Sequence, residues 1–142
     1  MFAFISNIIA GATMSIQGVM NTRLNEKIGL LEANAYVQGT AFIISLIAAL
    51  FFGKGNIREI TSVPWYYLLG GALGMVITVT VMLGIGKLSP TVAISVILIS
   101  QLITAALIDG FGIMDTQKVP FKWSQLAGVV LMIAGVIVFK NF

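Results

Sequence analysis

Polar side chains that could bind a small molecule occur inside long apolar stretches of this chain. Five candidates in or next to these stretches carry a primary amide, which can both donate and accept hydrogen bonds: Asn7, Gln17, Asn21, Gln38 and Gln101. A primary amide in hydrocarbon needs up to four partners, so each glutamine is predicted either to bridge two helices or to face a wet cavity. In a cavity, these amides would bind a neutral or weakly polar, hydroxylated compound.

One carboxylate lies close to this polar set along the chain. Asp109 follows Gln101 and Ala105 at four-residue steps, so the three share a helical face. Asp109 is predicted to end a span. It would be an interfacial carboxylate in water, a partner in a salt bridge, or a coupling group at the mouth of a cavity. No Asp, Glu, Lys or Arg lies near the middle of a span, where proton-coupled cation exporters usually hold a carboxylate.

Other kinds of chemistry are excluded by residues that the chain lacks. It contains no Cys and no His, so disulfides, thiol nucleophiles, the usual zinc sites and Ser-His arrangements are all excluded. The polar set holds no nucleophile-base pair, and we expect neither an enzyme nor a bound metal or cofactor. The net charge of +3 is small and spread out, so no nucleic-acid binding is expected.

The elements that position these side chains follow from composition. Of the 142 residues, 58% are hydrophobic and only 9% are charged, and the mean hydropathy is +1.04. This composition excludes an ordinary soluble fold and indicates an integral membrane protein. Five charge-free stretches are long enough, or nearly so, to cross a bilayer as helices: residues 2–20, 33–52, 65–86, 91–108 and 123–139. We therefore predict an all-α protein with a single transmembrane domain over residues 1–142.

Local signals agree with these spans. Pro64 precedes the third span at a position that suits a helix start, and Trp65, Tyr66, Tyr67 and Trp123 fit an interfacial aromatic belt. The first span lacks a basic n-region, so we interpret it as a retained helix rather than a signal peptide. Three glycines of the third span are predicted to let helices pack closely: Gly70, Gly71 and Gly74.

The positive charges give no preferred orientation. With five spans, four Lys and Arg residues fall on the side of the N-terminus, namely Lys54, Arg58, Lys118 and Lys122. Four also fall on the other side, namely Arg23, Lys27, Lys87 and Lys140. Because a Lys and Arg bias sets orientation, this balance predicts insertion both ways or pairing with an oppositely oriented homologue. Two inverted copies would form a ten-helix body with a pseudo-two-fold axis in the membrane plane, a plan that transporters use.

The chain also resembles the YdcZ-type family of inner-membrane exporters, within the drug/metabolite transporter superfamily. The matching stretches are residues 17–24 (QGVMNTRL), residues 65–74 (WYYLLGGALG), Gln101 with residues 108–112 (IDGFG), and residues 125–128 (QLAG) with 135–136 (GV). Two positions depart from the family pattern, because Ser100 stands where Gly is usual and Gly110 where His is usual. The second departure removes an imidazole and weakens any proton relay built on that position.

The resemblance implies a multi-pass protein of the bacterial inner membrane, small, and of dual topology or paired. It implies transport of a metabolite or toxic organic compound by alternating access, with an antiparallel homodimer or a heterodimer with a homologous five-helix subunit. The leading hypothesis is therefore a secondary transporter, and its substrate class is inferred from the amides rather than from the family. Two alternatives stay open at this point: a dual-topology ion channel, and a non-transporting scaffold subunit.

Overall fold

The regular elements are all helical in the computed structural model, which describes residues 1–120 and 122–140. The long helices are α1 (Phe2–Ile28), α2 (Leu30–Phe52), α3 (Gly70–Lys87), α4 (Pro90–Phe111) and α5 (Trp123–Lys140). Three short 3-10 helices lie in the connections: η1 (Ile57–Thr61), η2 (Trp65–Leu69) and η3 (Ile113–Asp115). Five helical segments are long and apolar enough to cross a membrane, with η2 and α3 forming one of them. The prediction of an all-helical chain with five spans is confirmed.

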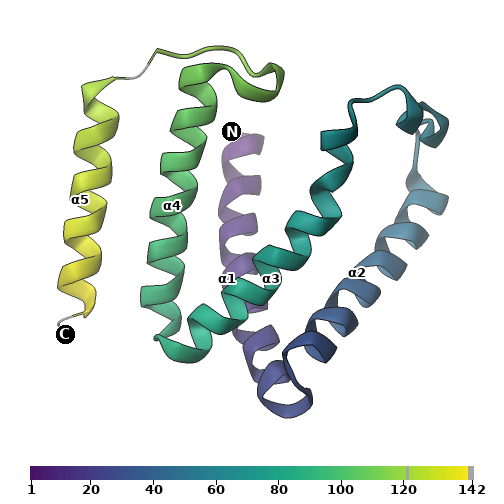
Figure 1. Ribbon diagram of the computed structural model, residues 1–142, viewed down its shortest axis with the longest axis horizontal. Helices are drawn as coiled ribbons and strands as arrows, with labels where there is room; N and C mark the ends of the chain where they lie inside the picture. Colours follow the sequence, from purple (N-terminus) through teal and green to yellow (C-terminus); the bar gives the residue numbers. More distant parts are fainter. Residues whose placement is uncertain (121, 141–142) are drawn as a thin grey trace. The chain divides into compact units, whose positions relative to one another are not determined.

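The chain divides into two compact units (Figure 1). Unit 1 comprises Met1–Lys87, which includes α1, α2 and α3. Unit 2 comprises Leu88–Phe142, which includes α4 and α5. Both units consist of helices that are long and apolar enough to cross a membrane. A single transmembrane domain over residues 1–142 therefore stays a prediction.

The connection between α1 and α2 is shorter than the sequence suggested. The first helix runs to Ile28 and the second begins at Leu30, so Gly29 alone forms the turn. Polar and charged residues after position 20 end the apolar span but favour a helix, and Arg23 and Glu26 form an ion pair one turn apart, at 3.0 Å. The φ of 98° and ψ of 158° at Gly29 belong to a region that only glycine adopts readily. Glycine at this position therefore decides where the helix stops.

The core of unit 1 lies at the end of the three helices nearest Gly29. A Cβ built on Gly18 would lie 2.8 Å from Ile85 Cδ1 and 3.2 Å from Val81 Cγ1, so α1 and α3 approach closely there. One turn further along, the Thr22 methyl lies 3.7 Å from the position of a Cβ on Gly86. Small residues thus permit this crossing, as in other membrane helix pairs. The buried residues of unit 1 all come from this end: Gly18, Asn21, Thr22, Ala33, Asn34, Met82 and Ile85.

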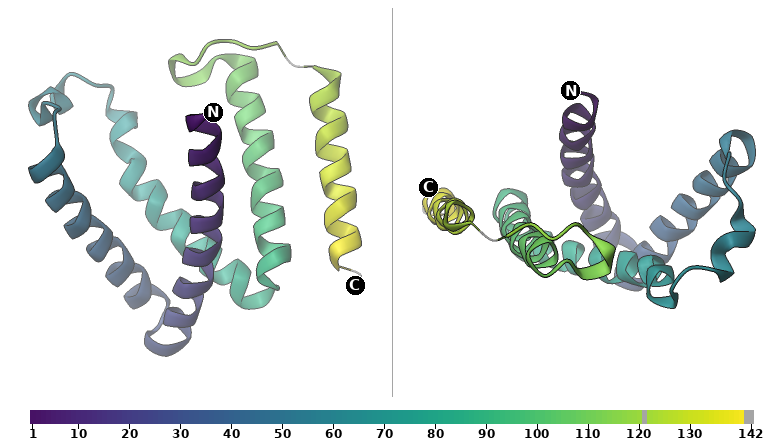
Figure 2. Two further views of the ribbon diagram at one scale, coloured as in Figure 1. Left: turned by 180° about the vertical axis from the view of Figure 1, so that it is seen from behind. Right: turned by 90° about the horizontal axis from the view of Figure 1, so that it is seen from above.

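Away from that end, the three helices of unit 1 separate. In Figure 1 and in both views of Figure 2, α1 and α2 diverge from their turn, and α3 runs away from the N-terminal half of α1. Exposure along the chain agrees, because every residue over positions 1–14 and 41–63 is exposed. Unit 1 is therefore packed at one end and open at the other.

Unit 2 is a helical pair that begins and ends on local signals. Ser89 Oγ accepts a hydrogen bond from Val92 N at 3.4 Å, and Pro90 occupies the first turn of α4. Gly112 ends α4 in the left-handed region at φ 67°, and its N–H donates to Ile108 O at 2.8 Å. A connection without a long helix then leads to α5, which packs against α4. The two helices run in opposite directions (Figure 2).

We expect a large side chain at position 18 to disrupt unit 1. Gly18→Leu would place its side chain against Ile85 and Val81, and overpacking of this kind usually lowers stability by about 1–3 kcal/mol. Gly11→Leu is the matched control, because the space around a Cβ at Gly11 is open to 4 Å. Thermal unfolding of both purified variants in detergent measures the difference. Equal midpoints for the two variants would show that the α1–α3 crossing does not depend on Gly18.

Candidate functional site

Gln38 bridges two helices of unit 1. Its Nε2 donates to Thr78 Oγ1 at 3.4 Å, and this bond joins α2 to α3. Thr78 in turn donates to Gly74 O at 2.9 Å, so the threonine oxygen acts as donor and acceptor together. A Cβ on Gly74 would lie 3.6 Å from Gln38 Nε2, an ordinary van der Waals distance, so the amide packs next to this glycine. Both polar side chains are half-buried. Of the two roles open to a span glutamine, Gln38 has the bridging one within the chain.

The other two predicted packing glycines have different surroundings. The positions of a Cβ on Gly70 and on Gly71 are both open to 4 Å within the described chain. Both residues begin α3, next to the aromatic turn of η2. Close packing of another helix against these two glycines stays a prediction. The described chain does not supply that helix, so a second protein surface would be needed.

Buried amides lie at the packed end of unit 1. Asn21 is 8% exposed and Asn34 is 5% exposed, whereas the neighbouring Thr22 donates to Gly18 O at 2.8 Å. Asn34 Oδ1 has no hydrogen-bond partner among the described residues. Sequence reasoning named Asn21 but missed Asn34, which the predicted span placed at its interfacial end. The available signal was helical spacing, because Asn34 precedes Gln38 by four residues on the same face of α2.

Two predicted amides of α1 are exposed. Neither Asn7 nor Gln17 forms a side-chain hydrogen bond within residues 1–120 and 122–140. The hydroxyls beside them on α1 behave differently: Ser6 donates to Phe2 O at 3.1 Å and Ser15 to Gly11 O at 3.0 Å. A hydroxyl can donate its hydrogen bond to a carbonyl of its own helix, whereas these two amides form no such bond. Both therefore remain available to a group outside the chain.

Unit 2 presents the fifth amide and the predicted carboxylate on α4. Gln101 and Asp109 are both exposed, and their side chains form no hydrogen bond or ion pair within the described part of the chain. The backbone carbonyl of Asp109 accepts from Val119 N at 2.9 Å, which fixes the start of the connection to α5. Because the two residues are eight positions apart, they lie on one face, about 12 Å apart along the helix.

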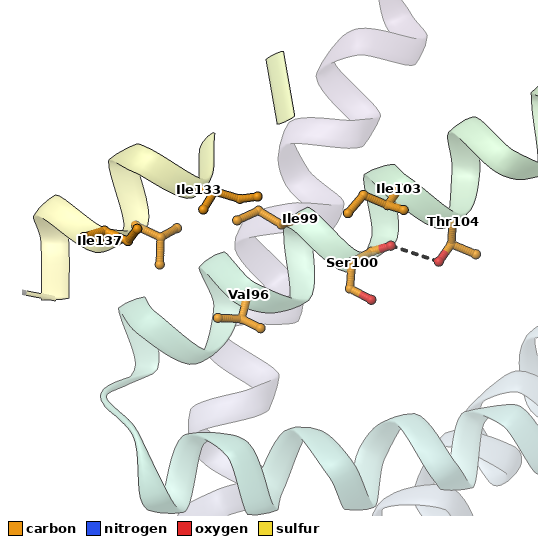
Figure 3. Close-up of a pocket in the computed structure, with 8 residues that line it drawn as sticks. Val96, Ile99, Ser100, Ile103, Thr104, Ile133 and Ile137 are labelled. Atoms are coloured by element: carbon orange, nitrogen blue, oxygen red, sulfur yellow. Dashed lines mark hydrogen bonds between the residues drawn. The ribbon is translucent and has the colours of Figure 1, made fainter. Parts of the chain in front are cut away.

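A largely apolar groove of about 400 Å³ lies between α4 and α5 (Figure 3). Its two polar residues are on α4, and Thr104 Oγ1 donates to Ser100 O at 2.9 Å. Isoleucines of the two helices face each other across the groove in Figure 3, Ile99 lying beside Ile133. The full lining is Val96, Ile99, Ser100, Ile103, Thr104, Ile133, Val136 and Ile137. Neither Gln101 nor Asp109 belongs to it, so this groove is separate from the predicted polar face of α4.

These positions give the candidate site two distinct parts. Gln38 and Asn21 belong to the packed half of unit 1, whereas Gln101 and Asp109 lie on the exposed face of α4 in unit 2. Among the described residues, no two of the five predicted amide side chains bond to each other. No group of three or more acidic residues that could hold a metal ion occurs there either. The arrangement can bind a ligand through hydrogen bonds. The Ser and Thr hydroxyls of the spans for which a bond is described donate to backbone carbonyls of their own helix.

Comparison with known proteins identifies the family. A family model described as "Putative inner membrane exporter, YdcZ" matches residues 2–138. The chain belongs to this family. The match confirms the resemblance seen in the sequence, and with five helices able to cross a bilayer it gives a multi-pass protein of the inner membrane. No curated protein and no solved structure matches the chain.

We expect substitution of Gln38 to lower the unfolding free energy and substitution of Gln101 to leave it unchanged. Gln38→Leu removes the bond to Thr78, and membrane double-mutant cycles assign such a bond about 0.6 kcal/mol on average. Thr78→Val should couple to it in a double-mutant cycle by a similar amount. Gln101→Leu should leave the unfolding free energy of the isolated chain unchanged, since its amide has no partner there. Unfolding in mixed detergent micelles measures all five proteins: the native chain, the three single variants and the Gln38→Leu/Thr78→Val double variant.

Additive effects of Gln38→Leu and Thr78→Val would contradict the bridge. A loss for Gln101→Leu as large as that for Gln38→Leu would contradict the distinction between the two glutamines. The second result would instead assign Gln101 a structural contact.

Proposed function

We propose that the chain is a subunit of a secondary transporter that exports a small, neutral or weakly polar compound by alternating access. Membership in a family described as inner-membrane exporters supports export. The observation that carries the proposal is the presence of exposed amides without partners inside apolar spans. Gln17 and Gln101 are the clearest of these, and Gln101 lies near the middle of its helix.

The depth of these amides is what makes them informative. Gln101 lies eleven residues after Pro90, about 17 Å along a helix that is about 33 Å long. This is close to the middle of a hydrocarbon core of about 30 Å, where lipid offers no hydrogen-bond partner. The amide therefore needs a hydrated cavity, a substrate or another helix. Exposed Leu, Ile and Phe side chains carry no such requirement, because lipid tails satisfy them.

The expected partner is a second five-helix subunit in the opposite orientation. The helix bounds leave the charge balance intact, since the same four Lys and Arg residues fall on each side when five spans are counted. An inverted copy would bring a second set of span amides to the midplane of the bilayer, where inverted-repeat transporters bind substrate. We propose an antiparallel homodimer, or a heterodimer with a homologous subunit.

The chemistry of the spans favours an uncharged substrate. Amides and hydroxyls donate and accept hydrogen bonds but do not neutralise a full charge in a medium of low dielectric constant. We infer that the substrate is hydroxylated and is bound without chemical conversion, so that no enzymatic step is expected. A channel would require charged rings or a filter of backbone carbonyls, and no feature of the described residues favours one.

We expect mixed orientation in cells. With Gly55→Cys as a single label site on this natively Cys-free chain, an impermeant maleimide should label about half of the protein from outside. Inserting two Lys after Lys54 should retain that loop in the cytoplasm and abolish labelling. Adding two Lys after Phe142 is the matched control and should raise labelling towards completion. A single native orientation, together with the absence of an oppositely oriented homologue in pull-downs, would exclude the antiparallel assembly.

We expect selective efflux of neutral hydroxylated compounds. Proteoliposomes are loaded with a mixture of sugars and sugar alcohols, plus tetraphenylphosphonium as an organic cation, and efflux is followed by mass spectrometry. A neutral compound should leave faster than from protein-free vesicles. Gln101→Leu should reduce its rate by about tenfold or more, because a site built on hydrogen bonds loses much of its affinity when one partner is removed.

Asp109→Asn in the same vesicles tests coupling. If an imposed pH gradient accelerates efflux in the native protein but not in this variant, Asp109 is the coupling group. Unchanged acceleration would exclude that role while leaving transport itself in place. Faster efflux of the cation than of every neutral compound would contradict the proposed substrate class.

A further inference from the structure

The segment between α2 and α3, residues 53–69, forms its own hydrogen bonds. We call it the interfacial segment. Asn56 caps η1, because its Oδ1 accepts from Arg58 N at 3.1 Å and its Nδ2 donates to Glu59 Oε1 at 3.4 Å. Ser62 Oγ donates to Glu59 O at 2.7 Å, and Thr61 Oγ1 to Arg58 O at 3.2 Å. Bonding within the segment lowers the cost of leaving water for a less polar medium.

Apolar and aromatic side chains of the segment are exposed. Ile57 is 84% exposed and Trp65 is 72% exposed, and Ile60, Val63 and Leu68 are exposed as well. The Trp65 and Tyr66 rings pack edge to face with centroids 6.2 Å apart, and the centroids of Tyr66 and Tyr67 are 4.6 Å apart. Tryptophan and tyrosine are the residues enriched where a bilayer meets water. A turn of this composition has the chemistry of the headgroup region.

Chain length places the segment at that depth. Helix α2 has 23 residues, so it is about 34 Å long and spans a hydrocarbon core of about 30 Å. The segment starts directly after the last residue of α2, and the third span, which begins with η2 inside the segment, returns through the bilayer. Between two spans, a short chain cannot extend far from the membrane surface.

Two cations of the segment lack partners. Lys54 and Arg58 are exposed, and their side chains form no ion pair or hydrogen bond within residues 1–120 and 122–140. Glu59 is held by Asn56 instead. A guanidinium binds phosphate through two parallel N–H groups, and a lysine ammonium adds a point charge. Two such cations and exposed aromatic rings in one short segment match the charge and depth of an anionic lipid headgroup.

We propose that the interfacial segment binds an anionic phospholipid, with Lys54 and Arg58 holding the phosphate and with Ile57 and Trp65 inserted among the lipids. The site is independent of the proposed transport activity. A second copy of the chain is the other possible cover for this surface. The hydrogen bonds within the segment and its positive charge favour lipid. If the same segment of a second copy covered this surface, its Lys54 and Arg58 would add two more positive charges that repel the first two.

The depth of Trp65 is the first test. In a Trp123→Phe variant, Trp65 is the only tryptophan, and the protein is reconstituted in phosphatidylcholine and phosphatidylglycerol with brominated acyl chains. Bromines close to the headgroup should quench Trp65 fluorescence more strongly than bromines near the bilayer centre. Quenching by aqueous iodide alone would place the segment in water and overturn the proposal. Protection from both quenchers would show that protein covers it, which also overturns the proposal.

Lipid selectivity is the second test. Native mass spectrometry compares retained phosphatidylglycerol with retained phosphatidylcholine for Lys54→Gln/Arg58→Gln and for the control pair Lys118→Gln/Lys122→Gln. Both pairs remove two charges from the same side of the membrane. The first pair should lower the preference for phosphatidylglycerol by about tenfold, because each Lys or Arg near an anionic lipid surface adds to the binding affinity. The control pair should change it much less.

Equal losses in the two pairs would show a response to net charge alone and overturn a specific site, as would no loss in either. Arg58→Lys with native Lys54 keeps both charges and should keep most of the preference. Circular dichroism of each variant reports whether the helices are retained. No loss of helix is expected, since neither substituted side chain has a partner within the described chain.

Discussion

The close approach of α1 and α3 at Gly18 is the contact on which unit 1 depends. In a bilayer, the hydrophobic effect does not drive helices together, so they associate where backbones can come close enough for dense van der Waals packing. Gly18 and Thr22 on one helix meet Ile85 and Gly86 on the other over two turns. The turn at Gly29 then returns the chain directly, so that Ala33 and Asn34 of α2 are buried at the same end. Packing at one end leaves the other ends of the helices apart.

The same environment divides the polar side chains into two groups. Hydroxyls in the spans donate to a carbonyl one turn back on their own helix: Ser6, Ser15, Thr22, Thr40, Thr78, Thr80, Ser95 and Thr104. They therefore say little about what lies opposite. A primary amide has two donor hydrogens and an acceptor oxygen, and a helix backbone with its bonds already formed cannot satisfy them. The amides thus report surroundings beyond their own helix, and Gln38 and Gln101 differ in that respect.

The sequence was sufficient for the five spans because a charge is costly at the centre of a bilayer, so charges mark the ends of spans. The span bounds do not give the end of the helix, and α1 continues past the predicted span to Ile28. Charge and hydropathy record where the membrane ends, whereas a helix ends where its backbone conformation changes, and here that is Gly29. Periodicity grouped residues by face on each helix, but it carried no information on which face of α3 meets α2. The bond from Gln38 to Thr78 therefore required the structure. Helical spacing placed Asn34 on the same face as Gln38, but only the structure shows that this face is buried at Asn34.

The difference between the packed end and the open end of unit 1 has a consequence for the proposed antiparallel pair. A two-fold axis in the membrane plane exchanges the two sides of the bilayer, so the packed end of one subunit and the open end of its partner lie on the same side. Each side of the membrane then has one tight helix crossing and one separated set of helices. Access would pass from one side to the other if the separated helices of one subunit close while those of its partner open, with the crossing at Gly18 kept in both. Because the crossing fixes which end of each subunit is open, each subunit would then control access on its own side of the membrane.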